Sequence, residues 1–246
     1  MGALLAVPGV EGAVVAAALR ACGLPDEGPY RVLVAETGAQ RAGLAEGALA
    51  EAVAHVVPGV GVAAVTGAVG RLPDGAAFAV VAGAAEADAL HEVWPLVAAA
   101  EPAVPLYGGT GAPVGGAREL NGALAEARYA LASARSTAAS RGSALTDAAT
   151  LTGLDALLTG VPAEVRTAYS RTVLGELLSN AVLLETLETF LACDGSWART
   201  AEALHLHVNS VHYRIGRIEH FTGRDLSRLY DRLDLWAALL CRADSA

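Results

Sequence analysis

The stretch LHLHVNSVHYRIGRIEHFTG at residues 204–223 holds four of the six histidines in the chain, two arginines and one acid. The residues before it, SWARTAEA at 196–203, predict a helix of about two turns with Ser196 as its N-cap. The letters HLH are too few for anything but a turn, and a second helix is predicted from about Val208 to a left-handed stop at Gly223. Two helices joined by such a short turn form the helix-turn-helix unit, whose second helix enters the major groove of DNA.

The second predicted helix has two different faces. On a helical wheel one face is mainly apolar, with Val211, Ile215, Ile218 and Thr222. The opposite face is polar and is made by Asn209, Ser210, Tyr213, Arg214, Arg217 and His220. Arginine suits guanine edges and phosphates, and asparagine suits adenine, so these residue types favour DNA recognition. The alternative is an ordinary amphipathic surface helix in an all-α domain.

The histidines do not show the spacing of a metal or catalytic site. His205 and His207 flank a single turn residue, and no pair has the ordered spacing of a zinc site. No serine or cysteine nucleophile motif accompanies them. We therefore expect no metal, no cofactor and no catalytic residue here. We interpret His205 as a turn residue and His207 as an N-cap whose position lets it meet a phosphate.

The composition indicates a folded protein, with 246 residues of which 54% are hydrophobic and 17% charged. All 17 basic residues are arginine, which excludes phosphate loops that end in lysine and Schiff-base enzymes. The net charge of −9 argues against a surface that is basic throughout, so DNA binding is expected to use a narrow positive strip, with two copies of it in a dimer. Three separated cysteines, Cys22, Cys193 and Cys241, favour a reduced, cytoplasmic protein.

Two apolar stretches resemble membrane segments without fitting them. Residues 52–70 include no full charge, but Pro58, Gly59 and Gly61 interrupt the run and predict a helix end, a turn and a strand. The N-terminus lacks a basic region before its apolar run, so a secretory signal is not expected. We expect no membrane partner.

The chain upstream alternates between strand and helix patterns. Strands are expected at 30–36, 59–67, 76–83 and 104–109, and helices at about 41–55, 85–100 and 116–135. This β-α-β-β-α-β-α order contains the ferredoxin-like split βαβ. Helical patterns dominate after the small-residue stretch STAASRGS, which looks like a linker. The predicted class is therefore α+β, with a ferredoxin-like α/β domain followed by an all-α helix-turn-helix domain.

The C-terminal residues also share a series of fixed spacings with a known family. The matching elements are Thr186-Leu187, Phe190-Leu191, Thr200-Ala201, Leu204, His207, Asn209, Ser210, Val211, Tyr213-Arg214, Arg217-Ile218, Thr222-Gly223 and Asp225-Leu226. They closely resemble the helix-turn-helix of PucR/CdaR-type bacterial transcription regulators. Ser210 stands where that family usually has threonine, and His212 where it commonly has arginine, so one contact is expected to be weaker or pH-dependent.

Residues 28–136 resemble the degenerate GGDEF-like domain that precedes this helix-turn-helix in the family. An active cyclase of that fold needs strand-end acids for two metal ions and an acidic Gly-Gly hairpin. Here Asp74 lies in an ordinary Pro-Asp-Gly turn, and the first strand ends in VAETG. The stretch YGGTGAPVGG at 107–116 has no lysine and contains Pro113, so we expect a loop after a strand. The resemblance implies an inactive regulatory or dimerising domain.

The resemblance implies a cytoplasmic transcription regulator that is not an enzyme and binds double-stranded DNA as a homodimer. A small-molecule effector or a sensor protein is a further expected partner. The residues expected to contact DNA are Thr200, His207, Asn209, Ser210, His212, Tyr213, Arg214 and Arg217. The expected segments are a helical lead-in at 1–27, the GGDEF-like domain at 28–136, a linker and helix at 137–180, and the helix-turn-helix domain at 181–246.

Two alternatives come from other classes of protein. The upstream domain could serve a nucleotide-binding or nucleotide-converting enzyme, although the missing acids argue against turnover. The helical C-terminus could instead be a protein-interaction module that only dimerises. The stripe suited to that task is made by Leu229, Leu233, Trp236 and Leu240, and such stripes are more often core.

Overall fold

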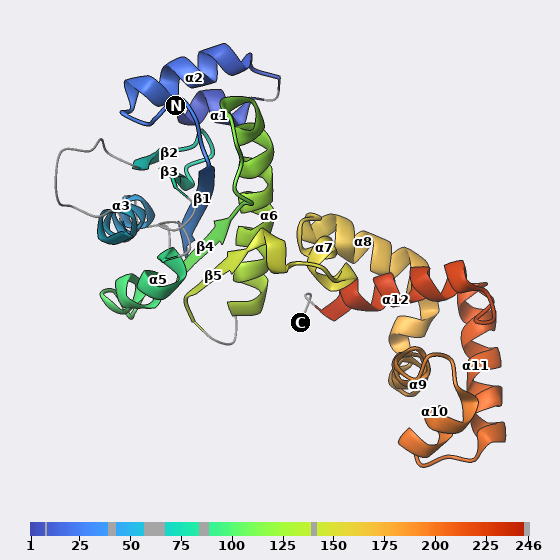
Figure 1. Cartoon of the computed structure of the whole chain (residues 1–246). Helices are drawn as coiled ribbons and strands as arrows, with labels where there is room; N and C mark the ends of the chain where they lie inside the picture. Colours follow the sequence, from blue (N-terminus) through green and yellow to red (C-terminus); the bar gives the residue numbers. More distant parts are fainter. Residues whose placement is uncertain (8, 39–42, 57–66, 84–88, 139–141, 244–246) are drawn as a thin grey trace. The chain divides into compact units, whose positions relative to one another are not determined.

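The computed structural model describes residues 1–7, 9–38, 43–56, 67–83, 89–138 and 142–243 (Figure 1). The chain divides into two compact units, Met1–Thr152 and Gly153–Ala246. The first unit combines a five-stranded sheet with helices, and the second is helical. The predicted α+β class, with an all-α unit after the sheet, is confirmed.

The sheet of the first unit has the strand order β2-β3-β1-β4-β5. Strand β1 is antiparallel to both β3 and β4, β2 is antiparallel to β3, and β5 is parallel to β4. The first four strands therefore have the arrangement of the split βαβ, with β1 at the centre. The strands are β1 (Tyr30–Thr37), β2 (Gly67–Arg71), β3 (Ala77–Ala82), β4 (Leu106–Thr110) and β5 (Ala144–Asp147).

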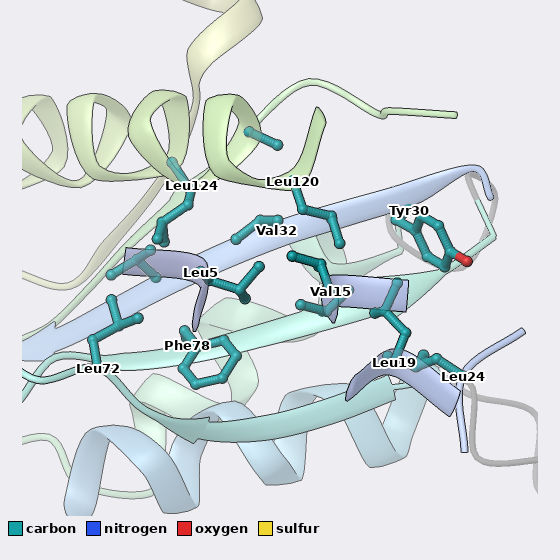
Figure 2. Packing of buried hydrophobic residues seen from close by; sticks show 14 of the residues in the cluster. Leu5, Val15, Leu19, Leu24, Tyr30, Val32, Leu72, Phe78, Leu120 and Leu124 are labelled. Atoms are coloured by element: carbon teal, nitrogen blue, oxygen red, sulfur yellow. The ribbon is translucent and has the colours of Figure 1, made fainter. Parts of the chain in front are cut away.

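Both faces of the sheet are buried. Successive residues of a strand point to opposite faces, so Tyr30 and Val32 of β1 belong to one core while Leu33 and Ala35 belong to the other. Figure 2 shows the first core, where residues of α1, α2 and α6 pack on the sheet. The helices α3 and α5 cover the second face. The helices are α1 (Gly2–Ala6), α2 (Gly12–Ala21), α3 (Leu44–Val56), α5 (Leu90–Ala99) and α6 (Leu120–Ala138), with short 3-10 turns η1 (Ala117–Glu119) and η2 (Ala148–Thr150).

Strand β4 carries two adjacent glycines because helices press on it from both sides. A Cβ on Gly109 would lie 2.2 Å from the carbonyl oxygen of Ala127 and 2.2 Å from the amide nitrogen of Leu131, both in the backbone of α6. A Cβ on Gly108 would lie 2.7 Å from the Trp94 ring of α5. Glycine therefore sets how closely α6 and α5 can approach the sheet.

The second unit packs its helices around one apolar core. The apolar side of α9 is buried, with Leu183, Leu187 and Phe190 at most 5% exposed. Asn180 caps this helix, because its side-chain oxygen accepts a hydrogen bond from the Leu183 amide at 3.1 Å. The elements are α7 (Leu154–Thr159), α8 (Ala163–Leu174), η3 (Gly175–Ser179), α9 (Ala181–Ala192), α10 (Trp197–Ala203), α11 (Val208–Thr222) and α12 (Leu229–Ala243).

The α/β unit extends beyond the expected limits of 28–136. Strand β5 lies in the segment 137–180, expected to be a linker and a helix, and it pairs with β4 from Tyr107↔Ala144 to Thr110↔Asp147. Asp147 at its end binds Arg31 of β1, with 2.6 Å between the guanidinium nitrogen and the carboxylate oxygen. A four-residue edge strand has too little apolar alternation to be predicted from sequence. The lead-in at 1–27 also belongs to this unit, since α1 and α2 pack in its core.

Two sequence expectations fall partly on residues outside the described ranges. Strand β2 begins at Gly67, the last residue of the strand expected at 59–67, and it continues through Arg71. Residues 57–66 of the apolar stretch 52–70 and residues 84–88 before α5 lie outside the described part. None of the helices in the described ranges is long and apolar enough to cross a membrane.

Replacing Gly109 with alanine is expected to destabilise the α/β unit by at least about 2 kcal/mol, because the new methyl group meets backbone atoms that cannot rotate away. Denaturant unfolding followed by circular dichroism measures this change. Gly122→Ala is the matched control, since a Cβ at this α6 position meets nothing within 4 Å. The control is expected to be neutral or stabilising by about 0.5–1 kcal/mol. Equal stability of the two variants would contradict the close contact at Gly109.

Candidate nucleic-acid interface

The turn between α10 and α11 is held by local hydrogen bonds. Ser196 caps α10, as predicted, by accepting a hydrogen bond from the Arg199 amide at 3.4 Å. His205 lies in the turn with a positive φ of 53°. His207 is the N-cap of α11, and its Nδ1 accepts a hydrogen bond from the Asn209 amide at 3.2 Å. The predicted turn and N-cap roles of these two histidines are therefore confirmed.

One face of α11 is buried, as the helical wheel predicts. Val211, Ile215 and Ile218 are at most 1% exposed. They belong to one apolar core with residues of α9, α10 and α12. The helix ends at Gly223, whose φ of 66° is left-handed and whose amide donates to the Glu219 carbonyl at 2.8 Å. These contacts determine which side of α11 is left for a partner.

The opposite face of α11 is exposed and polar. Asn209, Ser210, Tyr213 and Arg217 are all exposed, and Tyr213 retains 67% of its accessible area. The guanidinium of Arg217 lies 5.1 Å from the centroid of the Phe221 ring, a cation–π contact that restrains the side chain. No carboxylate among the described residues pairs with Arg217, so its charge is available to an anionic partner.

His212 stacks on a tryptophan. Its ring lies parallel to Trp197 of α10, with 3.8 Å between centroids and 11° between planes. Trp197 in turn contacts Phe190 of α9 at a centroid distance of 4.9 Å. These three rings, here called the aromatic stack, join α9, α10 and α11. Sequence reasoning missed Trp197, because an aromatic residue after an N-cap does not indicate which neighbouring helix it contacts.

Two of the predicted DNA contacts are placed differently by the structure. Thr200 is fully buried and its hydroxyl donates to the Ser196 carbonyl at 2.7 Å, so the expected phosphate contact by this side chain is wrong. Arg214 is half-buried and donates from Nη1 to the Thr186 hydroxyl at 3.2 Å. Arg214 therefore ties α11 to α9 and differs from Arg217, which is fully on the exposed face.

Three other arginines of the helical unit are paired with acids. Arg224 binds Asp231 at 3.6 Å and also contacts Asp234. Arg199 binds Asp194 at 2.9 Å, and Arg242 pairs with Glu188. These pairs reduce the positive field away from α11. The stripe suggested for dimerisation is divided, with Leu229 and Leu233 exposed and Trp236 and Leu240 partly buried.

An active cyclase needs acids at the end of the first strand and in the hairpin. In this structure the acids at these two places are bound by arginines. Asp74 in the β2–β3 turn pairs with Arg128 at 2.5 Å, and Glu36 near the end of β1 pairs with Arg135 at 3.1 Å. Within the described ranges, no group of three or more histidine, cysteine or acidic side chains is arranged to hold a metal ion. The acids near the strand end and hairpin therefore serve ion pairs in this structure.

The glycine-rich loop after β4 has its amides occupied by the protein's own carboxylates. The amides of Gly115 and Gly116 donate to Oε2 of Glu119 at 2.9 and 3.2 Å. The Ala112 amide donates to Oε2 of Glu126 at 2.8 Å. A phosphate would have to displace both acids to use these donors. The interpretation of this stretch as a loop after a strand holds for residues 111–116 only, because residues 107–110 belong to β4 itself.

Part of the helical unit matches a known family of domains. Residues 183–241 match the PucR C-terminal helix-turn-helix domain. The match begins within α9, contains all of α10 and α11, and ends within α12. The PucR helix-turn-helix domain therefore includes the aromatic stack, the turn histidines and the exposed face of α11. The resemblance found in the sequence is confirmed for this domain.

Three curated proteins are similar in sequence to part of this chain. The "uncharacterized protein in pkwA 5′ region" of Thermomonospora curvata is 45% identical over 89 residues, 35% of this chain and 49% of that protein. The transcriptional activator PmfR of Paenarthrobacter nicotinovorans is 39% identical over 97 residues, 35% of this chain and 21% of PmfR. YsfB of Bacillus subtilis is 35% identical over 86 residues, 35% of this chain and 23% of YsfB. The chain thus matches about half or less of the length of these relatives.

One solved structure aligns with nearly the whole chain. It is the regulator of polyketide synthase expression from Bifidobacterium adolescentis, with a TM-score of 0.42 and 20% sequence identity. The alignment covers 98% of this chain and 96% of that one.

Within the aromatic stack, Trp197 of α10 and His212 of α11 are expected to stabilise each other, which gives a measurable coupling free energy. Trp197→Ala is expected to lower the free energy of unfolding by about 2–4 kcal/mol, because it removes a large side chain packed on Phe190. His212→Ala is expected to cost about 1 kcal/mol, and the double variant less than the sum by about 0.5–1.5 kcal/mol. Urea unfolding of the four proteins completes the cycle. Additive losses would show that the two rings do not stabilise one another.

The Asp225 carboxylate stabilises the segment between α11 and α12. It accepts hydrogen bonds from the Ser227 hydroxyl at 2.6 Å and the Ser227 amide at 2.8 Å, and these lower the pKa of Asp225 below its ordinary value. A lowered folded-state pKa adds stability above the unfolded-state pKa, and that stability disappears as the pH falls through the folded-state value.

Asp225→Asn is therefore expected to reduce stability at neutral pH, with a difference from the wild type that shrinks below about pH 4. Thermal melts between pH 7 and pH 3 measure it. A difference that is constant across this range would rule out the charge of Asp225 as its cause.

Proposed function

We propose that this protein is a sequence-specific DNA-binding transcription regulator of the PucR/CdaR type. The observation that carries the proposal is the exposed face of α11, where Asn209, Ser210, Tyr213 and Arg217 lie opposite a buried apolar stripe. This face lies within the segment that matches the PucR helix-turn-helix domain. The similarity to PmfR, a transcriptional activator, supports the same function.

Each side chain on this face has chemistry suited to duplex DNA. Asn209, one residue into α11, is suited to a bidentate contact with adenine. Arg217 can bind guanine or a phosphate, and the hydroxyls of Ser210 and Tyr213 can donate to phosphates. Because His207 accepts at Nδ1, the neutral ring carries its proton on Nε2, which is free to donate to a phosphate.

His212 and Arg214 have supporting roles in this proposal. His212 is exposed but stacked on Trp197. It therefore presents the edge of its ring to a partner, where an arginine would present a long, flexible cation. Arg214 has one donor engaged by Thr186 and other guanidinium donors that can reach a phosphate. Thr200 takes no part through its side chain, because it is buried.

The regulator is proposed to act in the cytoplasm as a homodimer. One narrow strip of positive charge on a chain of net charge −9 supports few phosphate contacts, and a second copy doubles them. Two recognition helices would then read half-sites about 34 Å apart. The α/β unit is proposed as a non-catalytic, GGDEF-like regulatory or dimerisation domain that receives a small-molecule effector or a sensor protein. The arginine pairs of Glu36 and Asp74 support a non-catalytic role.

Arg217→Ala is expected to weaken binding to DNA from upstream of the protein's own gene by about tenfold, since each good arginine contact is worth about 1–3 kcal/mol. Fluorescence anisotropy titrations at several salt concentrations measure it. If Arg217 binds a phosphate, the slope of log K against log salt falls by about one. Arg217 is preferred to Arg214 for this test because Arg214 also contacts Thr186.

Arg171→Ala is the matched control, because Arg171 is an exposed arginine of the same unit on α8. Its affinity and salt slope are expected to equal those of the wild type. Wild-type binding that is absent or insensitive to salt, or equal losses in the two variants, would overturn the proposal. Footprinting of the bound DNA adds the half-site spacing that a dimer requires.

A further inference from the structure

A groove of about 250 Å³ lies between α3 and α5. These two helices cover one face of the sheet (Figure 1). The floor of the groove includes Val104 and Leu106, which are 5% and 4% exposed. Its walls come from both helices, with Leu44 and Ala48 on α3 and Val97 on α5. The lining is mainly apolar and opens to the surface.

The groove exists because the helices carry small residues where they face it. Gly43 and Gly47 line one side, and Ala98 and Ala100 line the other. A Cβ on Gly47 would meet no atom within 4 Å. Protein interiors normally fill such spaces with side chains, so the open volume is available to a ligand.

Among the described residues of the lining, the charged side chains are both acidic. They are Glu51 of α3 and Glu101, which follows α5. No partner among the described residues binds the Glu101 carboxylate, and Glu51 lies 3.5 Å from the His55 ring. Arg71, which would come within 4.0 Å of a Cβ on Gly43, is engaged by Glu46 at 3.0 Å. The described part of the rim of this apolar groove is therefore negatively charged.

We propose that this groove binds a small organic amine. The apolar body of the ligand lies over Val104 and Leu106, and its ammonium group donates charge-assisted hydrogen bonds to Glu101 and Glu51. A cavity of ~150 Å³ accommodates benzene, so this volume suits a single ring with a short aminoalkyl chain. The net charge of −9 adds a general attraction for a cationic ligand.

Three probes of one shape and different charge test the ligand class. They are 2-phenylethylamine, 2-phenylethanol and phenylacetate, titrated by calorimetry into the full-length chain at neutral pH and low salt. The amine is expected to bind about tenfold more tightly than the alcohol, because the positive charge of its ammonium group adds an ionic attraction to the carboxylates that a neutral hydroxyl lacks. Phenylacetate is expected to bind weakest. Equal affinities, absence of binding, or tighter binding of phenylacetate overturns the proposal.

Two variants locate the site. Gly47→Leu fills the groove without a backbone clash and is expected to weaken all binding at least about tenfold, by removing apolar contact area. Gly122→Leu is its matched control, since Gly122 is also an exposed helical glycine with nothing within 4 Å of its Cβ and lies outside the groove. The control is expected to bind as the wild type does. Equal behaviour of the two variants places any binding elsewhere.

Glu101→Gln tests the rim independently of any effect of Gly47→Leu on folding. It is expected to weaken binding of the amine about three- to tenfold and to leave binding of the alcohol unchanged, because only the amine uses the carboxylate charge. Unchanged affinity for the amine overturns the role of the rim. These measurements contain no DNA, so their outcome is separate from the test of DNA binding.

Discussion

The burial of Val211, Ile215 and Ile218 is the constraint on which the proposed interface depends. A helix with one apolar stripe can satisfy it only by turning that stripe into the core, and this turns the polar stripe outward. The apolar core of the helical unit therefore fixes the orientation of α11, and this orientation places Asn209 and Arg217 on the exposed side. The aromatic stack adds to this constraint by joining α11 to α10 and α9.

The α/β unit depends on a comparable constraint at its central strand. Strand β1 is buried on both faces, so helices must cover both sides of the sheet. Gly108 and Gly109 let two helices come close to β4, where any larger side chain would hold them apart. On the face covered by α3 and α5, the small residues leave space that is not filled by larger side chains of the described lining. This space is the groove that Glu51 and Glu101 also line. The same kind of residue thus gives close packing in one place and open volume in another.

Residues of one type have different roles because their surroundings differ. His207 caps a helix, His205 adopts a left-handed turn, and His212 stacks on an indole. Arg217 and Arg214 are three residues apart on one helix, yet the first is exposed and the second reaches a buried threonine. The distinction follows from their positions on the wheel, since Arg214 lies nearer the buried stripe. Residues of the same type within a shared family motif therefore do not all make the same contact.

The sequence by itself determined the elements with strong local signals. Periodicity specified α11 and its two faces, and Ser196 and Gly223 marked helix ends. Short apolar runs next to turn residues specified β1 and β3. Only the tertiary structure decided that β5 joins the sheet, that Thr200 is buried, and that Trp197 stacks on His212. These features depend on contacts between segments far apart in the chain or between helix faces, and such contacts leave no periodic trace in a single sequence. Local propensity and patterning determine where helices and strands form, whereas packing determines which of them contact one another.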